Sequence, residues 1–160
     1  MVQGAYNLEY DRQESQHPRV QSSHWWHFFH FELKRKLKDD EDSSIYSVVY
    51  EMKSIYPNHL PERAPKYIIA FRGTIPKPRS TMRQDLKLNI KVLTDELHMD
   101  KSRFKHVLEA VEKVVQEAES ANIWLAGHSL GSAIAMLVGK SLAQKGKYLE
   151  TFLFNPPFLR

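Results

Sequence analysis

One short segment, residues 127–131, constrains the fold of this 160-residue chain more than any other. It reads Gly-His-Ser-Leu-Gly, with an apolar Ile-Trp-Leu-Ala run before it and small apolar residues after it. Glycines on both sides of a serine let the chain turn sharply from a strand into a helix, because side chains there would collide with neighbouring backbone. We therefore expect a buried strand over 122–126, a tight turn at Ser129 and a helix over 130–145.

Hydrophobic patterning elsewhere predicts more strands and helices in alternation. Runs rich in β-branched, aromatic or apolar residues predict strands over 45–52, 67–71 and 148–154. Apolar residues three and four apart predict a helix from Asp100, its N-cap, to Ala118. Because helix and strand alternate in the second half, we expect an α/β fold with a mostly parallel sheet flanked by helices.

The chain has the length and composition of one domain. Hydrophobic residues make up 42% and charged residues 26%, which is close to the average for globular proteins. We expect residues 1–160 to form a single α/β domain. Within it, residues 1–42 are expected to be a polar and aromatic helical region and residues 43–160 the sheet core. Residues 1–23 read as loop or loosely packed helix, and the pattern over 85–97 fits a strand and a helix equally well.

An aromatic block over 24–31 is the most unusual part of the N-terminal region. It leads into Leu33 and Leu37, whose spacing favours a helix that ends near Lys38. Packing against the rest of the domain is the favoured role. A weak membrane-surface contact through Trp25–Phe31, helped by the basic residues that follow, is the alternative.

Composition excludes several function classes. The chain has no Cys, which rules out disulfides and thiolate catalysis, and its net charge of +4 comes from Lys and Arg scattered among acids, which gives no support for nucleic-acid binding. No apolar run approaches the ~20 residues of a membrane-spanning helix, and we recognise no signal peptide. These features do not identify the cellular compartment of the protein, for which the cytoplasm is the default expectation. They also leave the oligomeric state open.

Three histidines at three-residue spacing, His24, His27 and His30, are candidate metal ligands, as are the acids of 39–42, which lack the ligand spacing of a calcium-binding loop. Three imidazoles can ligate zinc, but no carboxylate at ligand spacing completes a site. We therefore predict no metal site and no cofactor.

The serine of the glycine-flanked turn is the candidate nucleophile. Ser129 would stand at the edge of the sheet next to a helix N-terminus, which favours negative charge. Acyl transfer needs two backbone N–H donors for the oxyanion of its tetrahedral intermediate. We assign one donor to Leu130, which follows the serine, and the other to Thr74, in the Arg-Gly-Thr turn after the strand 67–71.

These motifs carry a family resemblance. Phe-Arg-Gly-Thr over 71–74 and Gly-His-Ser-Leu-Gly over 127–131 resemble the class 3 lipase branch of the α/β-hydrolases. The chain is similar over nearly its whole length to a plant subgroup catalogued as GDSL esterase/lipase, although it contains no Gly-Asp-Ser-Leu motif. This further similarity runs through the segments 2–6, 11–14, 25–31 and 152–158. The resemblance implies a cofactor-independent Ser-Asp-His hydrolase of acyl esters, lipids in particular, with Ser129 as nucleophile and Thr74 and Leu130 at the oxyanion hole.

The resemblance also implies an order of catalytic residues that this sequence does not complete. Asp or Glu and then His should follow the nucleophile, yet residues 130–160 contain no His, no Asp and a single acid, Glu150. Without a base, a serine is a weak nucleophile at neutral pH. We therefore expect the N-terminal portion of an α/β-hydrolase domain that is a poor or inactive esterase alone.

Three explanations stay open for this incomplete triad. The chain is a fragment, a short natural isoform without activity, or a protein that recruits an acid and a base from a partner chain. The alternative function is a truncated pseudoenzyme that binds lipid or protein without catalysis.

Overall fold

The computed structural model describes residues 1–14, 25–53, 64–75, 101–119 and 121–157. The ambiguous segment 85–97 and the N-cap predicted at Asp100 lie outside them.

Five strands of the described residues form one sheet, in the spatial order in which they occur along the chain. They are β1 (Phe31–Lys38), β2 (Ile45–Met52), β3 (Tyr67–Phe71), β4 (Ile123–His128) and β5 (Glu150–Phe154). The pairs β1–β2 and β2–β3 are antiparallel, whereas β3–β4 and β4–β5 are parallel. The strands predicted over 45–52, 67–71 and around 122–126 are confirmed, and the last strand begins slightly later than predicted.

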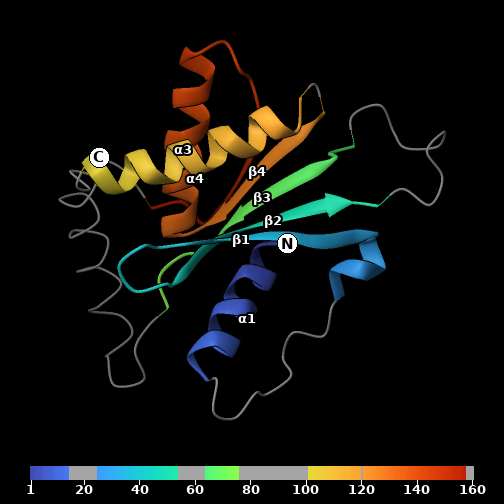
Figure 1. Cartoon of the computed structure of the whole chain (residues 1–160), viewed down its shortest axis with the longest axis vertical. Coiled ribbons are helices and arrows are strands. Elements are labelled where there is room, and N and C mark those ends of the chain that lie inside the picture. Colours follow the sequence, from blue (N-terminus) through green and yellow to red (C-terminus); the bar gives the residue numbers. More distant parts are fainter. Residues whose placement is uncertain (15–24, 54–63, 76–100, 120, 158–160) are drawn as a thin grey trace.

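Helices cover both faces of this sheet (Figure 1). The helices α3 (Lys101–Glu117) and α4 (Leu130–Gln144) lie on one face, and α1 (Val2–Gln13) lies on the other. Alternate strand residues point to the two layers: Ile69 and Phe71 pack under α3 and α4, while Ile68 and Ala70 pack toward α1. The fold is therefore an α/β sandwich of three layers.

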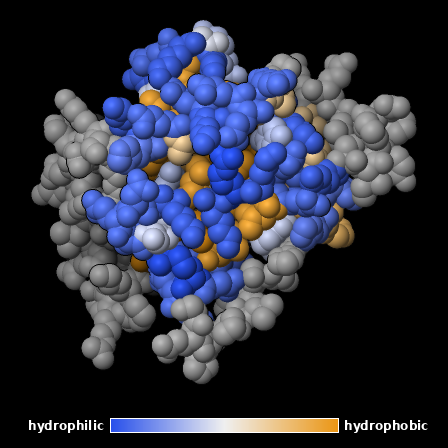
Figure 2. Space-filling model, viewed as in Figure 1, coloured by the Kyte–Doolittle hydropathy of each residue, from blue (hydrophilic) through white to orange (hydrophobic). Residues whose placement is uncertain are grey.

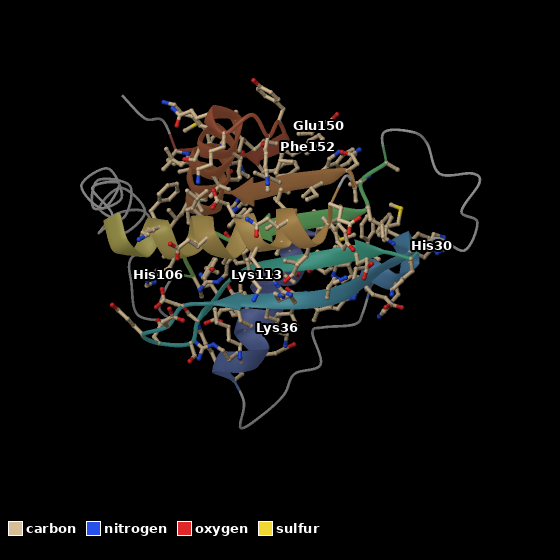
Figure 3. The ribbon with its side chains drawn as sticks, turned by 45° about the horizontal axis from the view of Figure 1, so that its top comes forward. His30, Lys36, His106, Lys113, Glu150 and Phe152 are labelled. Carbon is tan, nitrogen blue, oxygen red and sulfur yellow. The ribbon has the colours of Figure 1, made fainter. Side chains whose placement is uncertain are left out.

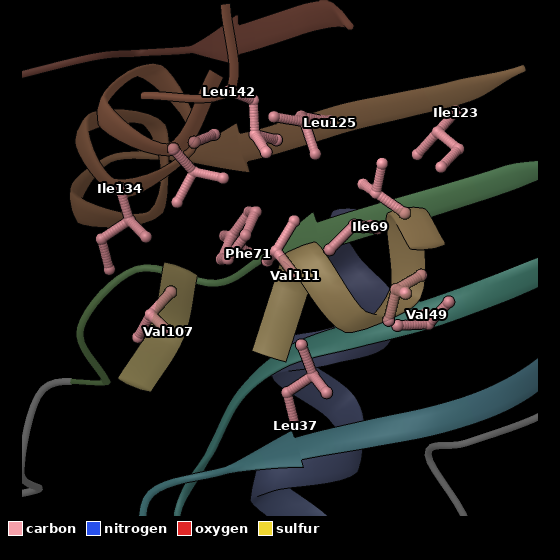
Figure 4. Close-up of a cluster of buried hydrophobic side chains, with 14 of the residues drawn as sticks. Leu37, Val49, Ile69, Phe71, Val107, Val111, Ile123, Leu125, Ile134 and Leu142 are labelled. Carbon is pink, nitrogen blue, oxygen red and sulfur yellow. The ribbon is translucent and has the colours of Figure 1, made fainter. Parts of the chain in front are cut away.

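The larger core lies between the sheet and the pair α3 and α4. Figure 4 shows Val107 and Val111 of α3 directed at the strands, with Leu125 of β4 beside Leu142 of α4. The apolar stripe that predicted α3 is thus the face that this helix buries. Helix α4 ends as expected, with Gly146 at φ +77° just beyond its last turn.

The sheet is mixed rather than mostly parallel, which corrects the expectation from the sequence. The reason is local: a short acidic turn over 39–44 joins β1 to β2, and a connection this short permits only an antiparallel pair. The parallel part begins at β3, where α3 and α4 serve as the crossover connections.

The helix predicted to run to Lys38 is wrong. Residues 25–29 form a 3-10 helix, η1 (Trp25–Phe29), and Phe31–Lys38 is strand β1. Phe31 and Leu33 pack on the α1 side of the sheet, whereas Leu37 packs into the core under α3 and α4, because a register shift between Leu33 and Arg35 changes the face to which the later side chains point. Pairing with β2 thus overrides the helical spacing of the leucines. Part of the predicted helical region 1–42 therefore belongs to the sheet, and a single domain over 1–160 stays a prediction.

The two edges of the sheet differ in chemistry. Figure 3 places Lys36 on the β1 edge and Phe152 with Glu150 on the opposite, β5 edge. Strand β1 exposes lysines, which discourage pairing with another chain, whereas β5 exposes Phe152, Leu153 and Phe154. The face seen in Figure 2 is mostly hydrophilic, with a narrow apolar band between its charged side chains. Among the helices of the described residues, none has the length and apolarity to cross a membrane.

We predict that the 160-residue chain self-associates through β5 and that Leu153→Lys weakens this association. A lysine on an edge strand opposes strand pairing because its charge would have to be desolvated. The measurement is the mass by light scattering over a concentration series. Tyr148→Lys is the control, because Tyr148 is 83% exposed but precedes the strand. Equal effects of both substitutions would contradict association through the strand edge.

Candidate active site

Ser129 occupies the tight turn between β4 and α4. Its backbone has φ 53° and ψ −122°, a conformation that non-glycine residues rarely adopt. A Cβ at Gly127 would overlap the Gly131 carbonyl, and a Cβ at Gly131 would overlap the carbonyl oxygens of Phe71 and Arg72. The strand–turn–helix geometry predicted from the motif is confirmed, and both glycines are required by direct backbone contact.

Hydrogen bonds fix this turn to the end of β5. The Ser129 N–H donates to the Phe154 carbonyl at 2.9 Å. The hydroxyl of Ser132, which is fully buried, lies 2.7 Å from the Gly127 carbonyl and 2.8 Å from that of Phe154. The sequence analysis did not identify Ser132. Its position, as a polar residue at the start of an otherwise apolar helix, could have indicated a hydrogen-bonding role.

The turn after β3 lies beside Ser129. Phe71 pairs with Gly127 in register, so the segments that follow β3 and β4 leave the sheet at the same edge. A Cβ placed on Gly73 would lie 3.1 Å from the Ser129 Cβ and 2.9 Å from the His128 carbonyl oxygen. The structure therefore brings together the two segments that contain Thr74 and Leu130. Thr74 is exposed, and Leu130 is the first residue of α4.

Helix α1 anchors this turn through Tyr6. The Gly73 N–H donates to the Tyr6 hydroxyl at 2.7 Å, and the same hydroxyl lies 3.0 Å from His128 Nδ1. Burial raises the pKa of Tyr6, although the Gly73 N–H and the charge of Arg72 act in the opposite direction. The other ring nitrogen, His128 Nε2, lies 3.5 Å from Asn155 Nδ2, beyond the end of β5. His128 thus connects α1 with the segment after β5.

A second anchor from α1 is the buried carboxylate of Glu9. It accepts two hydrogen bonds from Arg12 and one, at 2.7 Å, from the Ile45 N–H, and it lies 4.0 Å from Arg72 Nη2. Burial by itself would raise the pKa of Glu9, but these donors and charges outweigh it and hold the pKa below its usual value. Arg72 in turn donates to the Gly73 carbonyl at 2.8 Å.

Sequence analysis missed Tyr6 and Glu9. The helix α1 was one of two alternatives for residues 1–23, but its apolar residues give almost no stripe, so the buried face is not visible from periodicity. Only the resemblance through residues 2–6 and 11–14 marked this region.

Of the three regularly spaced histidines, the two in the described residues, His27 and His30, do not lie on one helix. His27 belongs to η1, His30 follows it with φ 59°, and His24 lies outside the described residues. Over the described ranges, no group of three His, Cys, Asp or Glu side chains is placed to hold a metal ion.

The comparisons with known proteins agree with this geometry. A family model described as "Lipase (class 3)" matches residues 64–157, more than half of the chain and all of the segment from β3 to β5. The chain belongs to the class 3 lipase family. An Arabidopsis thaliana protein named a GDSL esterase/lipase is 42% identical to this class 3 lipase chain over 99% of the chain. The match covers 47% of that protein, so the chain spans about half the length of the curated relative. No solved structure matches.

We predict that Glu9→Gln destabilises this class 3 lipase chain by about 2 kcal/mol at pH 7, because hydrogen bonds to a buried charge are lost. A carboxylate whose folded pKa is depressed stabilises above its unfolded pKa, and that stabilisation disappears as the pH falls through the folded value. The difference between wild type and variant should therefore shrink below about pH 4.5. Urea unfolding over a pH series measures it.

The control for this prediction is Glu32→Gln, which removes a half-exposed carboxylate on β1 whose partner is Lys53. Its effect should stay within about 0.5 kcal/mol. A Glu9→Gln penalty that does not change with pH would show that packing, not the carboxylate charge, stabilises this site.

Proposed function

We propose that the chain carries the nucleophile half of a serine hydrolase that acts on acyl esters. In this reaction the Ser129 Oγ bonds to the ester carbonyl carbon while a base takes its proton, and the alcohol then leaves with a proton to give an acyl-enzyme. The observation that carries the proposal is the placement of Ser129: a strained turn at the start of α4, with the turn after β3 packed against it.

The oxyanion donors in this proposal are the N–H groups of Leu130 and Thr74. The N–H groups of a first helical turn have no acceptor inside their helix, and the helix N-terminus favours the negative charge that forms there. In the turn after β3, the Gly73 N–H is already bonded to Tyr6, so it is not the donor. Thr74 is the next residue, which supports the assignment made from the sequence.

The base and the acid of the triad are not assigned to residues of this chain. No His or Asp follows Ser129 within the 160 residues, and the adjacent His128 is engaged by Tyr6. Backbone donors alone still accelerate acyl transfer, but a serine without a base reacts slowly. We therefore propose that the isolated chain has little or no esterase activity.

We predict that the isolated chain hydrolyses a short-chain chromogenic ester no faster than Ser129→Ala. Purified wild type and variant are compared at equal concentration, with circular dichroism showing that both are folded. Robust turnover by wild type that disappears in Ser129→Ala would contradict the prediction and would mean that a base is supplied in another way, such as across a dimer.

The substrate class that we propose is acyl lipid, and we propose η1 as a separate lipid contact, because the register places it at the end of the sheet opposite to Ser129. Phe28 is 82% and Phe29 54% exposed, and the Phe29 ring meets those of Phe28 and of the partly buried Trp25 edge-on, so an aromatic surface faces solvent. Aromatic rings of this kind suit the boundary between lipid headgroups and acyl chains.

We predict weak binding to anionic phospholipid vesicles that Phe28→Ser reduces several-fold, because burial of one aromatic ring is worth about 2 kcal/mol when complete and less at an interface. Co-sedimentation measures it, with Tyr148→Ser as a control for an exposed ring elsewhere. Equal loss in both variants, or no binding at all, would contradict the assignment to η1.

A further inference from the structure

We propose that Tyr6 is a positioning residue of the active site: its hydroxyl holds the turn after β3 against Ser129 and keeps the proton of His128 on Nε2. The positioning role rests on the function proposed above, while the proton assignment does not. Tyr6 comes from α1, more than 120 residues before the nucleophile, and the catalytic motif does not mark it.

The hydroxyl can serve both neighbours at once. A backbone N–H only donates, so at 2.7 Å from the Gly73 nitrogen the Tyr6 oxygen is the acceptor. Its own hydrogen is then free to point at His128 Nδ1, 3.0 Å away. Nδ1 must accept in this arrangement, and a neutral imidazole that accepts at Nδ1 carries its proton on Nε2. That proton faces the Asn155 side-chain amide, whose oxygen accepts it after a simple rotation of the amide.

Gly73 is the contact through which this bond would reach the nucleophile. The space where its Cβ would stand is bounded by the Tyr6 hydroxyl, the His128 carbonyl and the Ser129 Cβ, so the backbone there has no room to shift toward the serine. The N–H of Gly73 is held by Tyr6 and its carbonyl by Arg72. These bonds fix two successive peptide groups: Tyr6 fixes the one before the Gly73 Cα and Arg72 the one after it. The Gly73 carbonyl and the Thr74 N–H lie in the same planar peptide group, so fixing them also fixes the direction of the Thr74 N–H, which we assign to the oxyanion.

A phenylalanine at position 6 would keep the ring and remove both hydrogen bonds. The ring packs edge-on against His128, with centroids 5.9 Å apart, and this contact survives the substitution. The Gly73 N–H and His128 Nδ1 would lose their partner in a half-buried site, which is costly enough for the turn to rearrange. Burial raises the pKa of Tyr6, so the hydroxyl stays protonated at neutral pH in the wild type.

The experiment compares Tyr6→Phe with Tyr50→Phe by NMR on the labelled 160-residue chain. Tyr50 is the matched control because its buried side chain also donates a hydrogen bond next to α1, to the carbonyl of the N-cap Met1, but does not bond Gly73 or His128. We expect Tyr6→Phe to shift the amide resonances of Gly73, Thr74 and Ser129 and to let His128 populate both tautomers. Tyr50→Phe should leave these signals unchanged.

Three outcomes overturn the proposal. In wild type, a proton on Nδ1 of His128 contradicts the assigned hydrogen bond, and this measurement needs no variant to fold. In Tyr6→Phe, unchanged Thr74 and Ser129 signals show that the hydroxyl does not position the site. Equal shifts in Tyr50→Phe show a general loosening of α1 instead.

A second measurement connects this hydrogen bond to reactivity. Mass spectrometry follows the labelling of Ser129 by excess fluorophosphonate, and we expect Tyr6→Phe to be labelled about tenfold more slowly than Tyr50→Phe, because a misplaced donor costs one to two orders of magnitude in rate. Equal labelling rates overturn the positioning role. A wild type that excess reagent leaves unlabelled shows that Ser129 does not react without the missing base, and the NMR signals then decide the role of Tyr6.

Discussion

The contact on which this structure depends is an approach of backbone to backbone. Gly127 at the end of β4 and Gly131 in the first turn of α4 face each other, and Gly131 also faces the carbonyls at the end of β3. Only residues without Cβ allow the strand, the turn and the helix to come this close. The strain at Ser129, φ 53°, follows from this approach, so packing of the core elements around the glycines holds the serine in an unfavourable conformation.

Helix α1 adds a second constraint from the opposite face of the sheet. Tyr6 and Glu9 lie one turn apart on the helix and act on the two sides of the same turn: Tyr6 takes the N–H of Gly73, and Glu9 faces Arg72, which holds its carbonyl. Burying the Glu9 carboxylate costs free energy unless every oxygen is paired, and here the pairing fixes the position of α1 on β2. The stability of the helix and the geometry of the site are therefore coupled.

The sequence predicts the parts of this molecule in which local pattern and packing agree. The turn at Ser129, the strands β2, β3 and β4 and the helices α3 and α4 follow from glycine spacing and hydrophobic period. Strand β1 does not, because the spacing of Leu33 and Leu37 favours a helix, while pairing with β2 and a register shift between them place the two side chains on opposite faces of the sheet. Tyr6 and Glu9 could not be found at all, since their roles arise from contacts with residues far along the chain and leave no local pattern. The roles of Ser129, Thr74 and Leu130 stay predictions.

Strand β5 shows how far the site depends on an edge of the sheet. Its last carbonyl, that of Phe154, accepts hydrogen bonds from Ser129 and Ser132, so the end of this strand is part of the wall of the turn. Strand β5 is also the most exposed strand, with apolar side chains on both of its faces. The Phe154 carbonyl faces the turn rather than the free edge, so a displacement of β5 would pull on two hydrogen bonds of the turn at once. The position of the outermost strand and the conformation of Ser129 are therefore coupled.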